Sequence, residues 1–308
     1  MSELFIHLGL HKTATSTLQD QLYPATRELN YFSTLQEETR RFVHMATRQD
    51  PMHFDASIAR ELLRSRFSES RVNLLSNESL SGPPFAGVIE GGLDHRTPVI
   101  QNLSTCFPDA DLILVIRRQD KLAQSFYRQY IKSGGTRSIE RFYGFQDNRP
   151  PLMTTDRFKF SPYIKLLKKS FGGRLLVLPF EQFVEDPESF LLLLGDFLGV
   201  EWPVIELRKD NATRMGTFGL EASRFGNHLF RSLLNPAGLL PGVPIRRYGK
   251  YKMTSPINWL QDNSPFKGKI KSGTRIANVA SGIFEAVVED NKTLAAELDI
   301  DLGRYDYL

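Results

Sequence analysis

The stretch HLGLHKTATST, residues 7–17, joins a short apolar run to a glycine, a lysine and several hydroxyl side chains. A strand that ends in such a turn and continues as a helix directs backbone N–H groups and the positive end of the helix dipole to one point. Lys12 adds a mobile positive charge. Hydroxyl donors follow it at Thr13, Thr15, Ser16 and Thr17. The pattern favours an anion such as phosphate, although a capped helix without a ligand explains the same residues.

A second candidate anion site lies in DLILVIRRQDKLAQSFYRQYIKSG, residues 111–134. We expect an apolar strand to end at Arg117, and Ser125 follows eight residues later near the start of a helix. A guanidinium and a hydroxyl can hold one phosphate. A surface arginine or an ion pair would also explain Arg117. In one parallel sheet, this pair and the Lys12 turn would share the edge at which open α/β folds bind ligands.

Together the two motifs resemble those of the sulfotransferases that use 3′-phosphoadenosine 5′-phosphosulfate (PAPS). In that family a loop of the form K-[ST]-G-T-T holds the 5′-phosphate, and KTATS, Lys12 to Ser16, is similar to it, with Ala14 at the usual glycine. Arg117 and Ser125 match the type and spacing of the pair that holds the 3′-phosphate. The stretch LLVLPFEQFVEDPESFLLLLGDFLGV, residues 175–200, resembles the family's strand, glutamate and FLG-ending helix.

The resemblance implies that PAPS is the donor, that adenosine 3′,5′-diphosphate (PAP) is the product and that no metal takes part. It also implies that Lys12 neutralises the charge on the leaving oxygen. A further loop of the family lies over the cofactor, and we expect one of Arg208, Lys209 and Arg214, taken as Arg214, to reach the 3′-phosphate. The cofactor-binding set implied in this way is Lys12, Thr13, Ala14, Thr15, Ser16, Thr17, Arg117, Ser125 and Arg214.

Two residues compete for the role of the base that activates an acceptor hydroxyl. Glu78, in SNESLSG, follows an expected strand and would lie at the ligand-binding edge of a parallel sheet. It resembles the glutamate base of family members that act on glycans or protein tyrosine. His11 is the second choice, because it adjoins Lys12 and has a reference pKa near neutrality. A carboxylate that only complements a helix dipole would also explain Glu78.

Strands alternate with helices over the first two hundred residues. We predict strands at 4–8, 72–75, 112–116 and 175–178, and helices at 16–22, 55–67, 99–107, 121–132, 158–171 and 187–198. This alternation favours a parallel sheet covered on both faces, a three-layer α/β/α fold similar to the P-loop-like sulfotransferases. We expect a single domain, with a cofactor-binding core over about 1–206 and a helical cap over about 207–308 that ends in a helix at 276–298.

Composition and charge limit the classes of molecule that the chain is expected to bind. The chain has 308 residues, 41% of them apolar, and a net charge of +4 is too small for a dedicated nucleic-acid binder. Between Leu207 and Arg275, thirteen Lys/Arg face three Asp/Glu. This segment is either a solvated face or a surface for an acidic acceptor such as a glycan, or for an anionic membrane. One cysteine, Cys106, and no visible export signal lead us to expect a cytoplasmic protein.

The sequence therefore predicts a sulfotransferase that moves a sulfuryl group from PAPS to an acceptor hydroxyl, with a glycan or glycoconjugate as the preferred acceptor. A P-loop-like nucleotide kinase is one alternative, but His11 occupies the position where its loop requires glycine before the lysine. A non-catalytic nucleotide-binding protein is the other, and it would lack a suitably placed base. The histidines show no metal-ligand spacing, and we predict no metal site.

Overall fold

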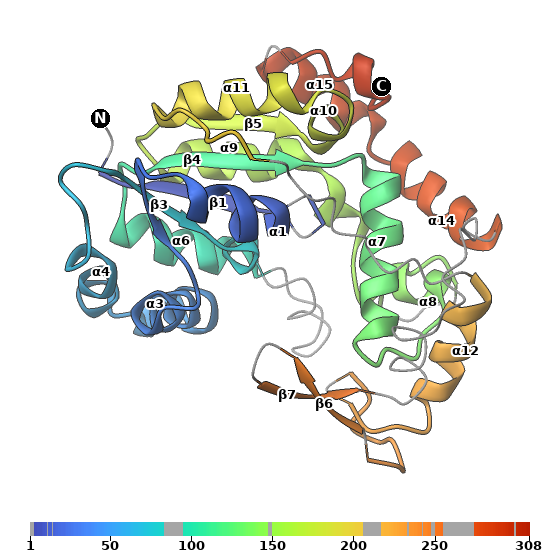
Figure 1. The fold of residues 1–308 in the computed structure, drawn as a ribbon. Coiled ribbons are helices and arrows are strands. Elements are labelled where there is room, and N and C mark those ends of the chain that lie inside the picture. The colour runs from blue at the N-terminus through green and yellow to red at the C-terminus, as the bar shows by residue number, and fades with distance from the viewer. Residues whose placement is uncertain are drawn as a thin grey trace.

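A five-stranded parallel sheet forms the centre of the computed structural model, with strand order β2-β3-β1-β4-β5 (Figure 1). The strands are β1 (Phe5–Gly9), β2 (Leu29–Phe32), β3 (Val72–Ser76), β4 (Asp111–Ile116) and β5 (Leu175–Pro179). The structure describes residues 3–10, 12–13, 15–82, 95–146, 150–205, 217–232, 234–241, 243–247, 250–254, 274–298 and 300–308.

Each face of the sheet has its own apolar core, because successive side chains of a strand point to opposite faces. On β1, Ile6 and Leu8 belong to one core, whereas Phe5 belongs to the other. The first core is covered by α3 (Glu37–Arg48), α4 (Ala56–Arg64), α6 (Arg96–Cys106) and α9 (Phe160–Ser170). The helical segment 15–25 and α11 (Pro187–Leu198) cover the second. The predicted three-layer α/β/α architecture is confirmed.

Local capping signals define two of these helices. The Asp55 carboxylate accepts hydrogen bonds from the N–H groups of Ser57 and Ile58, each at 3.0 Å, and so caps α4. Asp186 caps α11 by accepting from Ser189 N–H at 3.1 Å, and Pro187 occupies the first turn. The predicted bounds of α11 are confirmed, because these signals lie within the segment itself.

The first helix extends beyond its predicted end at residue 22 and continues past Pro24. It runs through α1 (Thr15–Thr17), a π turn η1 (Leu18–Leu22) and α2 (Tyr23–Ala25). The Tyr23 N–H donates to the Leu18 carbonyl, five residues earlier. A widened turn of this kind leaves room for the proline ring, which would clash with a carbonyl in a regular helix. The helix therefore continues past Pro24.

The remaining elements are the helices that follow β4 and β5 in the chain and four short turns. They are α7 (Gln119–Lys132), α8 (Ile139–Tyr143), α10 (Phe180–Glu185), α12 (Thr217–Asn227), α14 (Thr274–Glu285), α15 (Val288–Leu298) and the short turns η2 (Pro51–His53), η3 (Glu78–Ser81), η4 (Thr155–Phe158) and η5 (Gly303–Tyr305). The predicted final helix is two helices, α14 and α15. Helix α14 lies along α7, and α15 packs on α9 (Figure 1).

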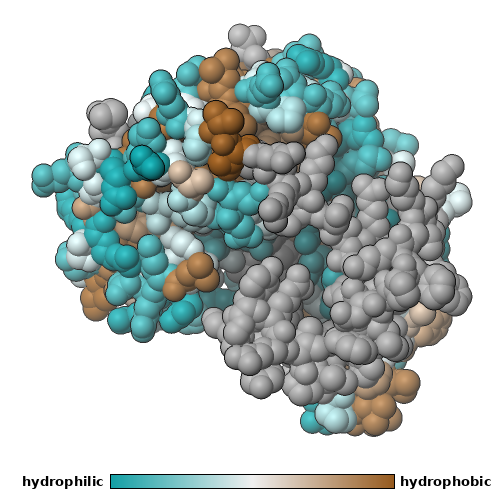
Figure 2. All heavy atoms as spheres, viewed as in Figure 1, coloured by the Kyte–Doolittle hydropathy of each residue, from teal (hydrophilic) through white to brown (hydrophobic). Residues whose placement is uncertain are grey.

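The C-terminal part is not wholly helical. Strands β6 (Val243–Arg247) and β7 (Lys250–Thr254) form an antiparallel hairpin that the sequence analysis did not predict. On the face shown in Figure 2, hydrophilic residues cover much of the described surface, and apolar residues gather over α11, where Leu192 and Leu193 are exposed. Among the described residues, no helix is both long and apolar enough to cross a bilayer.

Candidate active site

The carboxyl ends of three adjacent strands carry the residues predicted to do chemistry. The register pairs His7 with Ser76 and Gly9 with Val115, so the segments that follow β3, β1 and β4 lie next to one another. From β1 the sheet extends to β3 on one side and to β4 on the other. This arrangement makes β1 the point where strand order reverses, which is where open α/β sheets bind ligands. The Lys12 turn, Glu78 and Arg117 therefore share one edge.

The Lys12 turn is compact and locally strained. Lys12 is exposed and has a φ of 73°, a left-handed conformation that non-glycine residues rarely adopt. Gly9 permits the following helix to approach, since a Cβ at Gly9 would lie 2.6 Å from Thr15 Cγ2. Such strain is often found where a backbone holds a ligand. His11, the competing base, and Ala14 lie outside the described residues.

The hydroxyl side chains of this turn differ in exposure. Thr13 is buried, and its Oγ1 donates to the Leu10 carbonyl at 2.5 Å, so this hydroxyl stabilises the turn itself. Thr15 and Thr17 are also buried, whereas Ser16 is exposed. At the start of the helix, Ser16 therefore has the hydroxyl most open to a ligand.

Arg117 links the two anion motifs directly. Its Nη1 donates to the carbonyl oxygen of Lys12 at 2.6 Å, and its guanidinium lies over the Phe180 ring at 4.6 Å from the centroid. Burial lowers the pKa of Arg117, and the nearby Glu181 carboxylate opposes that shift, but the group remains charged at neutral pH. Its Nε is buried and has no hydrogen-bond partner within the described part of the chain.

Ser125 and Arg118 follow on the same segment. Ser125 is half-buried in the second turn of α7, close to the start of the helix as predicted. Arg118 forms a two-bond ion pair with Asp120 at 2.8 and 3.1 Å and also contacts Asp306 at 3.0 Å. The Arg118 guanidinium is therefore engaged by carboxylates of the protein. Arg117 is thus the residue of the pair with donor capacity toward a ligand.

Glu78 begins η3, directly beyond β3. Asn77 caps this turn by accepting from Ser79 N–H at 2.8 Å. Ser81 Oγ donates to the carbonyl of Gly9 at 3.1 Å and to the carbonyl of Glu78 at 2.9 Å. The half-buried Glu78 is thereby placed on a turn that is fastened to the end of β1, the strand that leads into the Lys12 turn.

A buried polar cluster lies beneath the turn. His7 is fully buried, and its Nδ1 lies 2.9 Å from Ser76 Oγ and 3.0 Å from the Tyr23 hydroxyl. Gln19 Nε2 donates to Ser76 Oγ at 2.9 Å. Burial lowers the pKa of His7 from 6.5 to about 4, so its ring is neutral at physiological pH. The cluster joins β1, β3 and the first helix, and His7 is a core residue.

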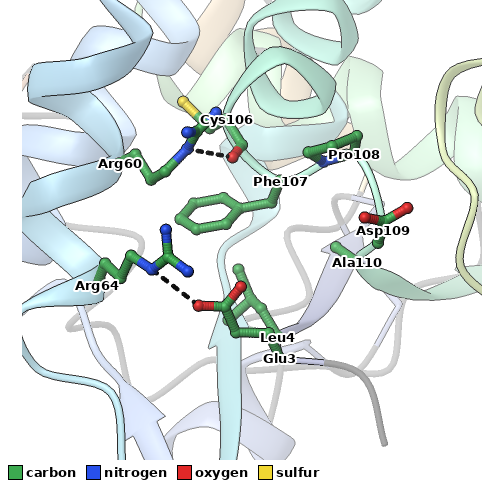
Figure 3. Close-up of a pocket in the computed structure, with 9 residues that line it drawn as sticks. All are labelled: Glu3, Leu4, Arg60, Arg64, Cys106, Phe107, Pro108, Asp109 and Ala110. Atoms are coloured by element: carbon green, nitrogen blue, oxygen red, sulfur yellow. Dashed lines mark hydrogen bonds and ion pairs between the residues drawn. The ribbon is translucent and has the colours of Figure 1, made fainter.

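A pocket of about 190 Å³ lies at the opposite edge of the sheet, where β1 and β4 begin (Figure 3). Its two arginines are already engaged, because Arg64 pairs with Glu3 at 3.0 Å and Arg60 Nε donates to the Cys106 carbonyl at 2.7 Å. Burial raises the pKa of the Cys106 thiol to about 12, so this thiol is unreactive. The pocket is therefore separate from the candidate site.

Two residues of the site were not predicted as functional. Glu181 accepts from the Arg118 N–H at 3.2 Å and from the Tyr307 hydroxyl at 2.7 Å. The sequence motif PFEQF marks Glu181, but no local signal marks Tyr307, which is distant in the chain. The basic residues predicted to lie over the cofactor, Arg208, Lys209 and Arg214, are outside the described residues.

Among the residues that are described, no group of three or more His, Cys, Asp or Glu side chains could hold a metal ion.

Comparison with known proteins identifies the family. Among solved structures, a sulfotransferase from Alicyclobacillus acidocaldarius aligns with 68% of this chain and 87% of its own, at 18% identity and a TM-score of 0.44. The sulfotransferase domain of the olefin synthase from Synechococcus PCC 7002 aligns over 92% and 94%, at 14% identity and a TM-score of 0.37. No curated protein matches the chain. The profile of the Sulfotransferase family matches residues 8–204, which include Lys12, Glu78 and Arg117, and the chain therefore belongs to this family.

Proposed function

We propose that the protein transfers the sulfuryl group of PAPS to an acceptor hydroxyl. The observation that carries the proposal is the 2.6 Å hydrogen bond from Arg117 Nη1 to the Lys12 carbonyl, which unites the two phosphate motifs in one site. A donor with phosphates at both the 5′ and 3′ positions requires two such motifs close together. ATP, which has no 3′-phosphate, gives no reason for the second.

The residues of the turn would hold the 5′ side of the donor. Lys12 and the N–H groups at the start of the first helix face the point where negative charge develops on the oxygen that leaves with PAP. Ser16 can add a hydroxyl donor there. Arg117 and Ser125 would bind the 3′-phosphate, and we assign Arg214 to the same group on the strength of the family resemblance.

Glu78 is the proposed general base. It would accept the proton of the acceptor hydroxyl while the acceptor oxygen forms its bond to sulfur and the bond from sulfur to the bridging oxygen breaks, releasing PAP. Its support is the fastening of its turn to the end of β1 through Ser81. His11 remains the alternative base.

The acceptor is proposed to be a glycan or glycoconjugate. The supporting feature is the basic segment from Leu207 to Arg275, whose thirteen Lys/Arg and three Asp/Glu would attract an anionic chain. The same charge would favour contact with an anionic membrane surface. We propose no nucleic-acid partner, and we place the reaction in the cytoplasm, where the buried free thiol of Cys106 stays reduced.

A transfer assay tests this function. The protein is incubated with PAPS, or with ATP and magnesium, and a panel of hydroxyl acceptors that includes neutral and sulfated glycans, phenols and simple alcohols. Release of PAP from PAPS and of ADP from ATP is followed. The proposal expects acceptor-dependent release that is lost in Lys12→Ala. The proposal fails if ATP with magnesium supports transfer to the same acceptors and PAPS does not.

A further inference from the structure

The end of the chain reaches the Arg117 site from a distant part of the sequence. Tyr307 is completely buried, and its carbonyl accepts from Asn291 Nδ2 at 2.8 Å. Asn291 on α15 also accepts from Gln119 Nε2, at 2.5 Å, at the start of α7. The C-terminal segment is thus anchored to two helices. One of them begins directly after Arg117 and Arg118.

Among the described residues, the Tyr307 side chain contacts one carboxylate, that of Glu181. Its hydroxyl donates to Glu181 Oε2 at 2.7 Å, while Glu181 Oε1 accepts the backbone N–H of Arg118 at 3.2 Å. Both oxygens of Glu181 therefore have a donor, one from the tail and one from the end of β4. The carboxylate is fixed in orientation by partners other than Arg117.

Arg117 is near this carboxylate but does not pair with it. Glu181 and Tyr307 are both close enough to act electrostatically on Arg117. The described residues nevertheless contain no ion pair or hydrogen bond between Arg117 and Glu181. The contacts of Arg117 are instead the Lys12 carbonyl and the face of Phe180, the residue next to Glu181. The buried Nε of Arg117 has no hydrogen-bond partner among the described residues.

We infer that Tyr307 is a positioning residue: its hydroxyl holds the Glu181 carboxylate out of an ion pair with Arg117 and keeps that guanidinium available for the 3′-phosphate of PAPS. The inference rests on the proposed function. Without the hydroxyl, Glu181 Oε2 loses its donor. Arg117 lies within electrostatic range of Glu181 and can replace that donor, whereas the Arg118 guanidinium is engaged by Asp120 and Asp306. A guanidinium paired with a carboxylate must give up that pair before it can bind a phosphate.

The substitution Tyr307→Phe is expected to weaken PAP binding about tenfold, the effect of losing one hydrogen bond to a charged group. Binding of 5′-AMP should not change, because AMP lacks the 3′-phosphate that Arg117 would contact. The near-isosteric Glu181→Gln removes the competing negative charge. In that background Tyr307→Phe should have no effect on PAP affinity, so the second substitution rescues the first.

The experiment is isothermal titration of PAP and of 5′-AMP into the wild type, Tyr307→Phe, Glu181→Gln and the double variant. Tyr305→Phe is the matched control, since it removes the phenol hydroxyl of another buried residue of the same tail, and this hydroxyl has no contact with Glu181 among the described residues. The melting temperature of each variant is recorded. Selective loss of PAP affinity in Tyr307→Phe, restored in the double variant, is the expected result.

Three results would overturn the inference. Tyr307→Phe could leave PAP affinity unchanged, it could weaken PAP and AMP equally, or the double variant could stay as weak as Tyr307→Phe. The last two would assign Tyr307 a purely structural role. Failure of the wild type to bind PAP is a separate outcome, which would contradict the proposed function itself.

Discussion

The Oγ atom of Ser81 donates a hydrogen bond to the carbonyl oxygen of Gly9 at 3.1 Å. This bond fastens the turn that begins with Glu78 to the end of the strand that leads into the Lys12 turn. A carboxylate and a lysine that are far apart in the sequence are thereby held at one edge of the sheet. Their position at the same edge of the sheet is the basis for assigning them to one reaction.

Glu78→Gln should separate binding from chemistry. The amide keeps the shape of the side chain but cannot accept the acceptor's proton, so turnover should fall by about 10² or more while PAP affinity persists. Initial rates and PAP titrations on the same preparation measure the two effects. His11→Asn is the matched variant. If that variant carries the loss and Glu78→Gln is tolerated, the base is His11.

Gly9→Ala should damage the Lys12 turn. The added methyl would lie 2.6 Å from Thr15 Cγ2, so the first helix must move away from the strand, at a cost of about 1–3 kcal/mol in the free energy of unfolding. PAP affinity should fall as well. Gly282→Ala in α14 is the control, because its new Cβ would meet only Phe145 at 3.8 Å. Equal unfolding free energies for the two variants would show that Gly9 is not needed for close approach.

The neutral His7 should make stability depend on pH. Because burial lowers its pKa to about 4 in the folded protein, the unfolded chain binds the proton more readily between pH 6.5 and 4. Its contribution is therefore complete above pH 6.5 and is lost as the pH falls, by about 2 kcal/mol between pH 7 and 5.

Urea unfolding of the wild type and of His7→Asn, at about pH 7 and about pH 5, measures the contribution of His7 to the free energy of unfolding. Asparagine can retain an acceptor near the position of Nδ1 but does not titrate. The difference between the two pH values should be smaller in the variant by about 2 kcal/mol. An identical pH dependence in both proteins would show that His7 is not the titrating group.

Reversing charge in the basic hairpin should affect the acceptor and not the donor. The triple variant with Arg246, Arg247 and Lys250 changed to Glu should raise the KM for an anionic acceptor, because it replaces attraction by repulsion. PAP affinity should change little. An equal loss of PAP affinity would place these residues at the cofactor instead.

The elements that the sequence predicts correctly are those whose signals, such as caps and apolar runs, lie within the element itself. Helix α11 has its cap, its proline and its final glycine within one segment, and strand β4 contains a continuous apolar run from Leu112 to Ile116. Strand β2 was missed because it is only four residues long and two of them are half-buried. The hairpin β6–β7 was missed because its basic residues were interpreted as a charged surface, although Lys250–Thr254 alternates polar with apolar residues as a strand does.

In the candidate site too, the residues with a local sequence signal were predicted and the others were not. Lys12 and Arg117 were named from motifs in which spacing and residue type are local. The left-handed backbone at Lys12 was not foreseen, since the missing glycine drew attention to Ala14. The contact between Tyr307 and Glu181 joins residues 126 positions apart, and no pattern in either segment predicts it. Contacts of this kind depend on the tertiary structure, which brings distant segments together.

The central claim is that this sheet edge binds a nucleotide with phosphates at both the 3′ and 5′ positions, and thermal unfolding in the presence of PAP tests it most directly. Ligands that bind the folded state raise the melting temperature. We expect PAP to raise it, ATP with magnesium to have a much smaller effect, and Arg117→Ala to remove most of the PAP shift, since a charge-assisted contact of this kind contributes about 1.5–3 kcal/mol to binding. A shift with ATP and magnesium but none with PAP would contradict the claim.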